Sequence, residues 1–447
     1  MIKDLQKNWI ISYLSEVASL IRGVSYDKSD LGTNDNAHTA LLRANNIQDG
    51  NLIFDDMQYV LSTVVDETQH MRKFDILIAM SSGSKKLVGK TAQYMENENY
   101  LTFGAFCSVV RPNQYINPKF LGFFFQSDDY RKVVSNASKG VNINNLKNSD
   151  ITNIEIPLPP LAEQGRIVAK IEELFAGIDA GVENLKSVKN QIALYRQSVL
   201  KSAFDFDAST FSVLKNLIDK VRYGTSKKCS TEENVNSMPV YRIPNIDFKK
   251  GVLDKTDLKF ASFDDSEKSS LMLKSGDILI IRSNGSLNLV GRAALVYNTD
   301  TNGLYAGYLM RLRIKDTEKL LPKFLLHFLN SGKARTYIEE KAKSTSGVNN
   351  INSEEISDLQ IPVPTLAEQE KIVAEIESRF ERADALESAV DRALNDAEKL
   401  KQAVLKKAFS GELVPQNPDD EPASVLLARI RAARASELSA KKGKRKR

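Results

Sequence analysis

The chain of 447 residues has little of the material from which metal centres and many catalytic sites are built. It contains three histidines, two cysteines and one tryptophan. His38, His70 and His327 stand at positions that have no counterpart in the other half of the chain, so they support no catalytic or metal-binding cluster. Cys107 and Cys229 lie in different halves without metal-ligand spacing, and a reducing compartment is the default expectation.

The sequence also lacks the signals of export or membrane insertion. The N-terminus, MIKDLQKNWI, is charged and has no apolar signal core, and no run of about 18 apolar residues occurs. We therefore expect a cytoplasmic protein with no membrane association. The net charge of +5 is compatible with a polyanionic partner but does not establish one. The length leaves room for two to four domains.

Recognisable enzyme motifs are missing as well. Residues 83–91 resemble a phosphate-binding loop, but five residues separate the glycines where the motif G-x-x-x-x-G-K-[ST] has four. The matching stretch from Gly285 to Ala293 loses both the lysine and the hydroxyl. We find no Asx-Pro-Pro-aromatic motif of amino-methyltransferases and no nuclease cluster of carboxylates and lysine. The sequence therefore predicts no catalytic residues, no metal site and no cofactor in this chain.

What the sequence does contain is one long repeat. IPLPPLAEQGRIVAKIEELFAGIDA begins at Ile156, and IPVPTLAEQEKIVAEIESRFERADA begins at Ile361, 205 positions later. Upstream, matched segments are separated by offsets that drift from 199 to 207, as small loop insertions produce. Downstream the offset stays at 205. A whole domain and a connecting helix of fixed length therefore occur twice.

Each copy reads as a strand-rich domain followed by a long helix. Short apolar runs at 75–78 and 278–281 are bounded by Gly, Ser and Asn, as strands are. The segment 119–134, opened by Pro118, and its counterpart 323–338 are predicted to be helical.

After a proline-rich lead-in, apolar residues recur in steps of three and four from Ile167 to Val199 and from Ile372 to Val404. Some 40 residues span about 60 Å at ~1.5 Å per residue, longer than a small domain is wide. We expect an antiparallel coiled coil with pseudo-two-fold symmetry. The alternative is that each stripe faces its own domain.

The predicted fold is α+β with five parts. These are a first domain at 1–155, a central spacer helix at 156–207, a second domain at 208–360, a C-terminal spacer helix at 361–410 and a tail at 411–447. A short helix is expected at 423–438, and the basic end at 441–447 is expected to be disordered.

Polar loops at matched positions are candidates for contacts with DNA. Both copies keep the frame Ser-x-Gly-Ser-x-x-Leu-Val-Gly followed by a cation, and a second frame pairs Arg with Asn. Such groups suit phosphates and base edges. For the loops the alternative is a solvated hairpin, and for Arg-Asn it is a turn capped by Asn. The asparagines before the spacer helices are either caps or phosphate contacts. The candidates are Arg43, Asn45, Asn46, Ser84, Lys85, Lys86, Lys90, Asn142, Asn144, Arg242, Asn245, Arg282, Asn284, Ser286, Asn288, Arg292 and Asn349.

The doubled IP-x-P-x-LAEQ-x-x-IV block, with the Ala408-Phe-Ser-Gly-Glu-Leu-Val414 ending, resembles the specificity subunit of a type I restriction–modification system. The resemblance spans essentially the whole chain. It implies two target recognition domains, each reading one half of a bipartite, asymmetric double-stranded DNA site. The helices would dock modification (methyltransferase) subunits, normally two, that use S-adenosylmethionine to methylate adenine. Restriction motor-nuclease subunits would join with ATP and Mg. The family pattern does not fix which residues read bases.

Two other readings compete with this one. The chain could serve a partner in which restriction and methylation are fused, which neighbouring genes would reveal. It could instead be a coiled-coil scaffold with two adhesive domains and no affinity for DNA. Phosphate contacts predict a steep loss of DNA affinity with salt, whereas a scaffold predicts none.

Overall fold

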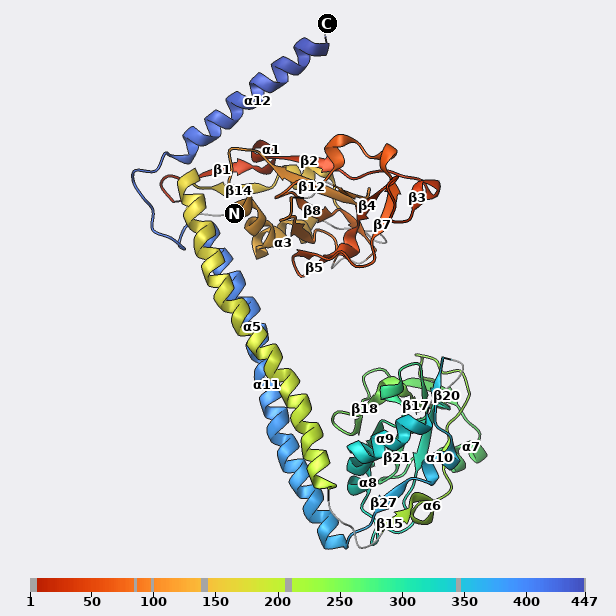
Figure 1. Cartoon of the computed structure of the whole chain (residues 1–447). Coiled ribbons are helices and arrows are strands. Elements are labelled where there is room, and N and C mark those ends of the chain that lie inside the picture. The colour runs from red at the N-terminus through yellow and green to blue at the C-terminus, as the bar shows by residue number, and fades with distance from the viewer. Residues whose placement is uncertain are drawn as a thin grey trace. The chain divides into compact units, whose positions relative to one another are not determined.

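The structure, a computed structural model, describes residues 6–83, 87–97, 100–137, 144–205, 211–342 and 347–445. The chain divides into two compact units. Unit 1 comprises Met1–Asn184 and Ala393–Arg447, and unit 2 comprises Leu185–Arg392. Each unit contains one globular domain together with parts of both long helices (Figure 1).

The domain of unit 1 is built around a buried strand in a four-stranded antiparallel sheet. That strand, β8 (Ile76–Ala79), is buried at every position, which explains its unbroken apolar run. The sheet order is β10 (Thr91–Gln93), β8, β12 (Cys107–Pro112) and β2 (Ala18–Arg22). A second sheet has the order β11 (Leu101–Phe103), β4 (His38–Leu42), β7 (Gln58–Leu61) and β3 (Leu31–Gly32). β1 (Ile10–Tyr13) pairs with β14 (Glu155–Leu158), which leads into the long helix.

The domain of unit 2 repeats this plan. Its main sheet has the order β16 (Arg222–Tyr223), β25 (Leu309–Leu312), β21 (Ile278–Ile281) and β23 (Ala293–Leu295). The second sheet has the order β20 (Lys259–Ser262), β17 (Ser237–Tyr241) and β24 (Leu304–Tyr305). β15 (Phe211–Val213) pairs with β27 (Gln360–Pro362). The predicted strands and the predicted duplication of an α+β domain are confirmed.

The helical segments predicted at 119–134 and 323–338 are each two helices, which corrects the expectation of one. They are α2 (Pro118–Gln126) with α3 (Asp128–Ala137), and α8 (Pro322–Leu329) with α9 (Gly332–Lys341). The break falls at a serine each time. Ser127 is extended and its hydroxyl accepts a hydrogen bond from the Tyr130 N–H, and Ser331 accepts from the Ala334 N–H. A serine N-cap starts a new helix more favourably than it continues an old one.

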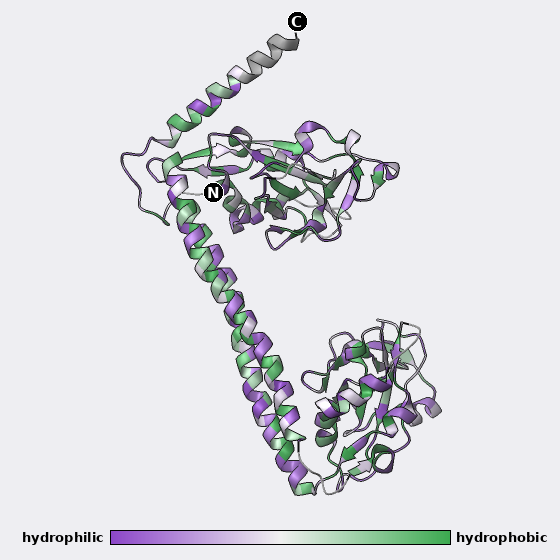
Figure 2. Cartoon of the chain, in the orientation of Figure 1, coloured by the Kyte–Doolittle hydropathy of each residue, from purple (hydrophilic) through white to green (hydrophobic). Residues whose placement is uncertain are grey.

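The two spacer helices are present as predicted, α5 (Leu161–Ala203) and α11 (Leu366–Ser410). In unit 2, Lys189 pairs with Asp391 (2.7 Å) and Arg196 with Asp384. In unit 1, Lys401 pairs with Asp179 (2.5 Å). As the residue numbers rise along α5, the residue numbers of the partners on α11 decrease. The two helices are therefore antiparallel. Apolar and polar residues alternate along both of them (Figure 2).

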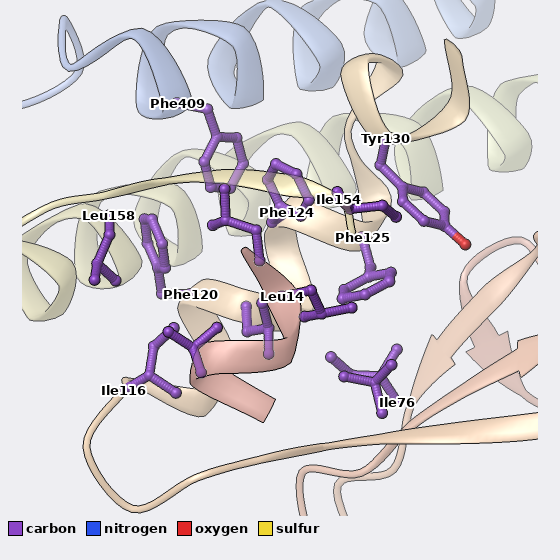
Figure 3. Close-up of a cluster of buried hydrophobic side chains, with 14 of the residues drawn as sticks. Leu14, Ile76, Ile116, Phe120, Phe124, Phe125, Tyr130, Ile154, Leu158 and Phe409 are labelled. Atoms are coloured by element: carbon purple, nitrogen blue, oxygen red, sulfur yellow. The ribbon is translucent and has the colours of Figure 1, made fainter. Parts of the chain in front are cut away.

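The ends of the long helices pack into the domains. The alternative, that the row of apolar residues on each helix faces its own domain, is therefore also partly right. In unit 1, Ile167 and Ile171 of α5 and Phe409 of α11 join the core of the domain. Phe409 lies edge-on to Phe120 and Phe124, with ring centroids 5.2 and 5.4 Å away (Figure 3). In unit 2, Phe204, which directly follows α5, makes the matching contacts with Phe324 and Phe328, at 5.3 and 5.4 Å.

The glutamine of the repeated LAEQ sequence is a buried joint between helix and domain. In unit 1, Gln164 accepts a hydrogen bond from the Asn117 N–H (2.8 Å) and donates to the Pro159 carbonyl (3.0 Å). In unit 2, Gln369 accepts from the Leu321 N–H (2.9 Å) and donates to a proline carbonyl (3.0 Å). Both side chains are fully buried. The repeat is thus explained by a structural role at the start of each helix.

The tail forms α12 (Ala423–Arg445), longer than the predicted short helix. Leu426, Leu427 and Ile430 pack into the core of unit 1, and Arg431 pairs with Glu16 (2.7 Å). The helix continues to Arg445, and residues 446–447 of the basic end lie outside the described residues. None of the described helices has the length and apolar character needed to cross a membrane.

Candidate nucleic-acid interface

The frame of the repeated glycine- and serine-rich loop is fixed by packing. In unit 1 the loop follows β9 (Ser81–Ser82) and ends at Gly89, whose φ is +72°. A Cβ at Gly89 would lie 2.1 Å from Val134 of α3, so only glycine fits. In unit 2 the loop follows β22 (Ser283–Asn284) and ends at Gly291, whose φ is +81° and where a Cβ would lie 2.5 Å from Ile338 of α9. The preceding valines, Val88 and Val290, are buried.

Between these fixed points, the loop of unit 2 presents polar groups. Asn284 accepts a hydrogen bond from the Ser286 N–H (2.8 Å), and Asn349 donates to the Gly285 carbonyl (3.0 Å). Ser286 and Asn288 are exposed. The structure therefore brings Asn284, Ser286, Asn288 and Asn349 together on one loop and the adjoining strand β26 (Asn349–Asn350).

Arg282 lies at the base of the same loop. Its Nε donates to Asn350 Oδ1 (3.2 Å), and its guanidinium lies 4.5 Å from the centroid of the Tyr223 ring. In unit 1, Ser84, Lys85, Lys86 and Asn142 lie outside the described residues. Only the backbone of Asn144 is described, in β13 (Asn144–Asn145), which pairs with β9.

The matched Arg-Asn frames form turns. Asn46 is 1% exposed, caps the Arg43 N–H (2.9 Å) and donates to the carbonyls of Ile53 and Asp55. Asn245 is also 1% exposed and caps the Arg242 N–H in the same way (2.9 Å). These contacts favour the turn-capping alternative for both buried asparagines.

The two arginines of these frames bind acidic turns. Arg43 donates to the carbonyl (2.7 Å) and carboxylate (3.1 Å) of Asp56, and Asn45 reaches the same carboxylate (3.3 Å). Arg242 makes both contacts with Asp257 at 2.8 Å. The guanidinium groups are thus already engaged within the protein, as structural residues would be.

Lys90 and Arg292, the cations that follow the loops, each line a cleft between the domain and the long helices of its own unit. The unit 1 cleft has a volume of about 600 Å³ and the unit 2 cleft about 400 Å³. Corresponding elements line both clefts: the turn after β5 (Ile47–Gln48) or β18 (Ile246–Asp247), the loop end, and both long helices.

The two clefts differ in charge. Among the residues that line them, unit 1 has three cations (Lys90, Arg131, Lys401) and three carboxylates (Asp49, Asp179, Glu398). Unit 2 has five cations (Lys189, Arg196, Lys249, Lys250, Arg292) and one carboxylate (Glu387). The turn that carries Asp49 and Gly50 in unit 1 carries Phe248, Lys249, Lys250 and Gly251 in unit 2. Lys189 and Arg196 already pair with carboxylates of α11, so Lys249, Lys250 and Arg292 make the unit 2 cleft the more attractive to an anion.

Arg292 is a partly buried cation of the unit 2 cleft. Its guanidinium lies 5.0 Å from the centroid of the Phe248 ring, and its Nε donates to the Asn288 carbonyl (3.1 Å). Burial, together with the nearby Arg335, lowers the pKa of Arg292. An incoming phosphate would offset this unfavourable environment. Lys249 and Lys250 are exposed, and sequence reasoning missed them because they lie outside the matched loop frame.

The described residues contain no group of three or more His, Cys, Asp or Glu side chains that could hold a metal ion. His327 lies in the wall of the unit 2 cleft, edge-on to Phe380 at 5.9 Å. Burial lowers the pKa of His327 to about 4, so its imidazole is neutral near pH 7. Both cysteines are free, and burial raises the pKa of Cys107 to about 12.

Comparisons with known proteins agree with this duplicated plan. A family model described as "Type I restriction modification DNA specificity domain" matches twice, over residues 6–190 and 209–395. The chain is 36% identical over 466 aligned positions to the "Type I restriction enzyme EcoKI specificity subunit" of Escherichia coli K12, with 99% of both chains covered. It is 34% identical over 463 positions to the "Type I restriction enzyme StySPI specificity subunit" of Salmonella potsdam, again with 99% coverage.

A solved structure supports the fold at lower identity. Its title concerns complex assembly and conformational transition of the type I R-M system. It covers 92% of this chain and 99% of its own length, with a TM-score of 0.67 and 21% sequence identity. This likeness shows that the arrangement of elements described above occurs in a solved protein.

Proposed function

The chain belongs to the family of type I restriction–modification specificity subunits, which direct DNA sequence specificity and are not themselves catalytic, and we propose that it reads a bipartite, asymmetric DNA site. Each globular domain would contact one half-site, and the helical pair α5–α11 would join the two. The observation that carries this proposal is that the two domains share the same backbone geometry and buried contacts around their loops but differ in the exposed residues.

The equal frame consists of backbone geometry and buried contacts. Gly89 and Gly291 end the loops with positive φ, and strands in the same order carry them. The exposed residues differ between the two domains. At the cleft, unit 1 has Asp49 where unit 2 has Lys249 and Lys250, and the unit 2 loop carries polar residues such as Asn288. Two copies that bound one palindromic site would gain from equal contacts. Unequal contacts suit half-sites of different sequence.

We propose that the cationic unit 2 cleft holds DNA phosphate. Lysine and arginine contacts to phosphate supply affinity without sequence information. Arg292 closes the reading loop and lines the cleft, so a strand whose bases met the loop would bring a phosphate nearby. Direct readout would fall to Asn288, whose side chain is exposed on a loop that Asn284 and Asn349 shape, since an asparagine amide can bond adenine in the major groove.

Partner subunits would complete the enzyme. We propose that two modification subunits dock on the helical pair and supply methylation with S-adenosylmethionine, and that restriction subunits supply cleavage with ATP and Mg. Exposed apolar side chains support docking on the helices. Tyr195 of α5 and Leu400 of α11, 205 positions apart, are 43% and 53% exposed. We place the complex in the cytoplasm, because DNA is its proposed substrate.

The test is methylome sequencing of a host that expresses this chain with its modification subunits. The expected motif has two specified parts of different sequence, separated by an unspecified gap of fixed length. The double variant Asn284→Ala, Asn288→Ala should relax one half of that motif and leave the other unchanged. A palindromic or contiguous motif, or relaxation of both halves together, would refute the proposed division of labour.

A further inference from the structure

Each domain exposes one aromatic side chain on a matched turn next to the proposed reading loop. Phe106 lies in the turn between β11 and β12, and Tyr308 lies in the turn between β24 and β25, 202 positions later. The same offset separates the strands that lead into the loops. Phe106 is 72% exposed and Tyr308 is 64% exposed.

Both aromatics are held in place by the same backbone contacts. In unit 1, the N–H groups of Met80 and Ser81 donate to the Phe106 carbonyl at 2.9 and 3.2 Å. In unit 2, the Arg282 N–H donates to the Tyr308 carbonyl at 2.9 Å. Met80 and Arg282 are the residues from which β9 and β22 continue into the loops.

A third strand ties each turn to the polar residues before the long helix. The Leu146 N–H donates to the Met80 carbonyl (2.9 Å), and the Ile351 N–H donates to the Arg282 carbonyl (2.9 Å). The aromatic turn, the strand that leads into the loop (β9 or β22) and the asparagine strand therefore form one hydrogen-bonded junction in each domain. A ligand that binds at this junction also meets the ring.

The exposure of these rings points to a flat, apolar partner. An aromatic side chain contributes most when it removes 150–250 Å² from water, and here most of that area is left uncovered. The surroundings are cationic and polar. Arg282 stacks on the half-exposed Tyr223 in unit 2, and Arg22 is exposed on β2 in unit 1. An exposed ring among cations and amides suits stacked bases on a phosphate backbone.

We propose, on the basis of the function proposed above, that Phe106 and Tyr308 insert between base pairs, one in each half-site. DNA methyltransferases extrude the target base from the duplex, because their active site cannot take up a base that is still stacked. Apolar side chains inserted between base steps unstack them and lower the cost of that movement. Each ring would hold its half-site open while the partner subunit takes up the adenine. The step is non-covalent and consumes no reactant.

The experiment uses the assembled complex of this chain with its modification subunits. Duplexes carry 2-aminopurine in place of the methylated adenine in one half-site or the other, and both fluorescence and DNA affinity are measured. The variants are Phe106→Ala, Tyr308→Ala and Tyr308→Phe. Tyr100→Ala is the control, because Tyr100 is 61% exposed in unit 1 and lies before β11, not in the turn between β11 and β12.

Each alanine variant should abolish the fluorescence rise in one half-site only and weaken binding by roughly 5- to 150-fold, the range for loss of one base–aromatic stack. Tyr308→Phe and Tyr100→Ala should behave as wild type. Unchanged fluorescence and affinity in both alanine variants would overturn the proposal, and so would loss of complex assembly, which would make the rings partner contacts. Failure of the wild-type complex to bind any specific sequence would instead refute the function proposed above.

Discussion

Removing the two lysines from the unit 2 cleft should change the salt dependence of DNA binding by a defined amount. Lys249 and Lys250 are exposed on the turn after β18, and the Lys250 ammonium lies 3.9 Å from the Asp247 carboxylate. Each lysine that neutralises a phosphate contributes about 0.9 to the slope of log affinity against log salt. The double variant Lys249→Ala, Lys250→Ala should therefore lower the slope by about 1.8.

The same slope sets the loss of affinity. At 0.15 M salt, a slope of about 0.9 corresponds to about 1 kcal/mol, or about fivefold in affinity, for each contact. The double variant should thus bind roughly 30-fold more weakly. Binding of the assembled complex to a duplex carrying its site, measured by fluorescence anisotropy from 50 to 300 mM salt, gives both quantities. The loss should be equal on non-specific duplexes, because phosphate contacts carry no sequence information.

Two controls separate this effect from a general change in charge. Asp49→Ala removes a carboxylate from the matched turn in unit 1 and should not weaken binding. Lys319→Ala removes a lysine of unit 2 that does not line the cleft and should leave the slope unchanged. If Lys319→Ala lowered the salt-dependence slope as much as removal of one cleft lysine, only the net charge of the protein would matter. An unchanged slope in the double variant would refute phosphate binding in the cleft.

Three further predictions test the helices and the cleft wall. Deleting residues 189–195 and 385–391 together removes one heptad from each long helix, which is about 10 Å of helix or about three base pairs of DNA. This variant should not methylate sites that have the wild-type gap between half-sites. An unchanged gap would exclude a spacing role for the helices. Phe409→Ala should cost about 3–5 kcal/mol and reduce amide exchange protection of α2, with that of α8 as control. Because the pKa of His327 is lowered to about 4, the unfolding free energy should fall by about 3 kcal/mol as pH drops from 6.5 to 4. His327→Leu should abolish that pH dependence, and a variant that kept it would refute the role of His327.

The long helices and the domain duplication could be predicted because their signals are local or repeated. A 3.6-residue period reports helix directly, and the constant offset of 205 after Ile156 fixes equal helix lengths. The break at Ser127 was missed because the apolar pattern continues across it, and only the N-cap bond to the Tyr130 N–H marks the second helix. The signal was present in the sequence as a serine at the same place in both copies.

The candidate interface was predicted less well, because it depends on which polar groups are already occupied. Arg43 and Asn46 have the residue types that read bases, yet the structure uses them to close a turn. The cleft could not be found from sequence, because its lining comes from a turn, a loop end and two helices that are far apart in the chain. Phe106 was missed because an aromatic residue in a strand-rich segment is usually expected in the core.

The positions kept in both copies and the positions that differ divide according to their physical role. Gln164 with Gln369 and Phe409 with Phe204 make the same buried contacts between helix and domain. Buried hydrogen bonds and packed rings leave little freedom, since an unmatched partner costs about 1–3 kcal/mol. The turn at Asp49, which became a pair of lysines in unit 2, has no such constraint. The contacts between helix and domain involve residues other than those of the exposed loops. A change in the DNA sequence that one domain recognises therefore requires no change in the contacts that attach this domain to the helices.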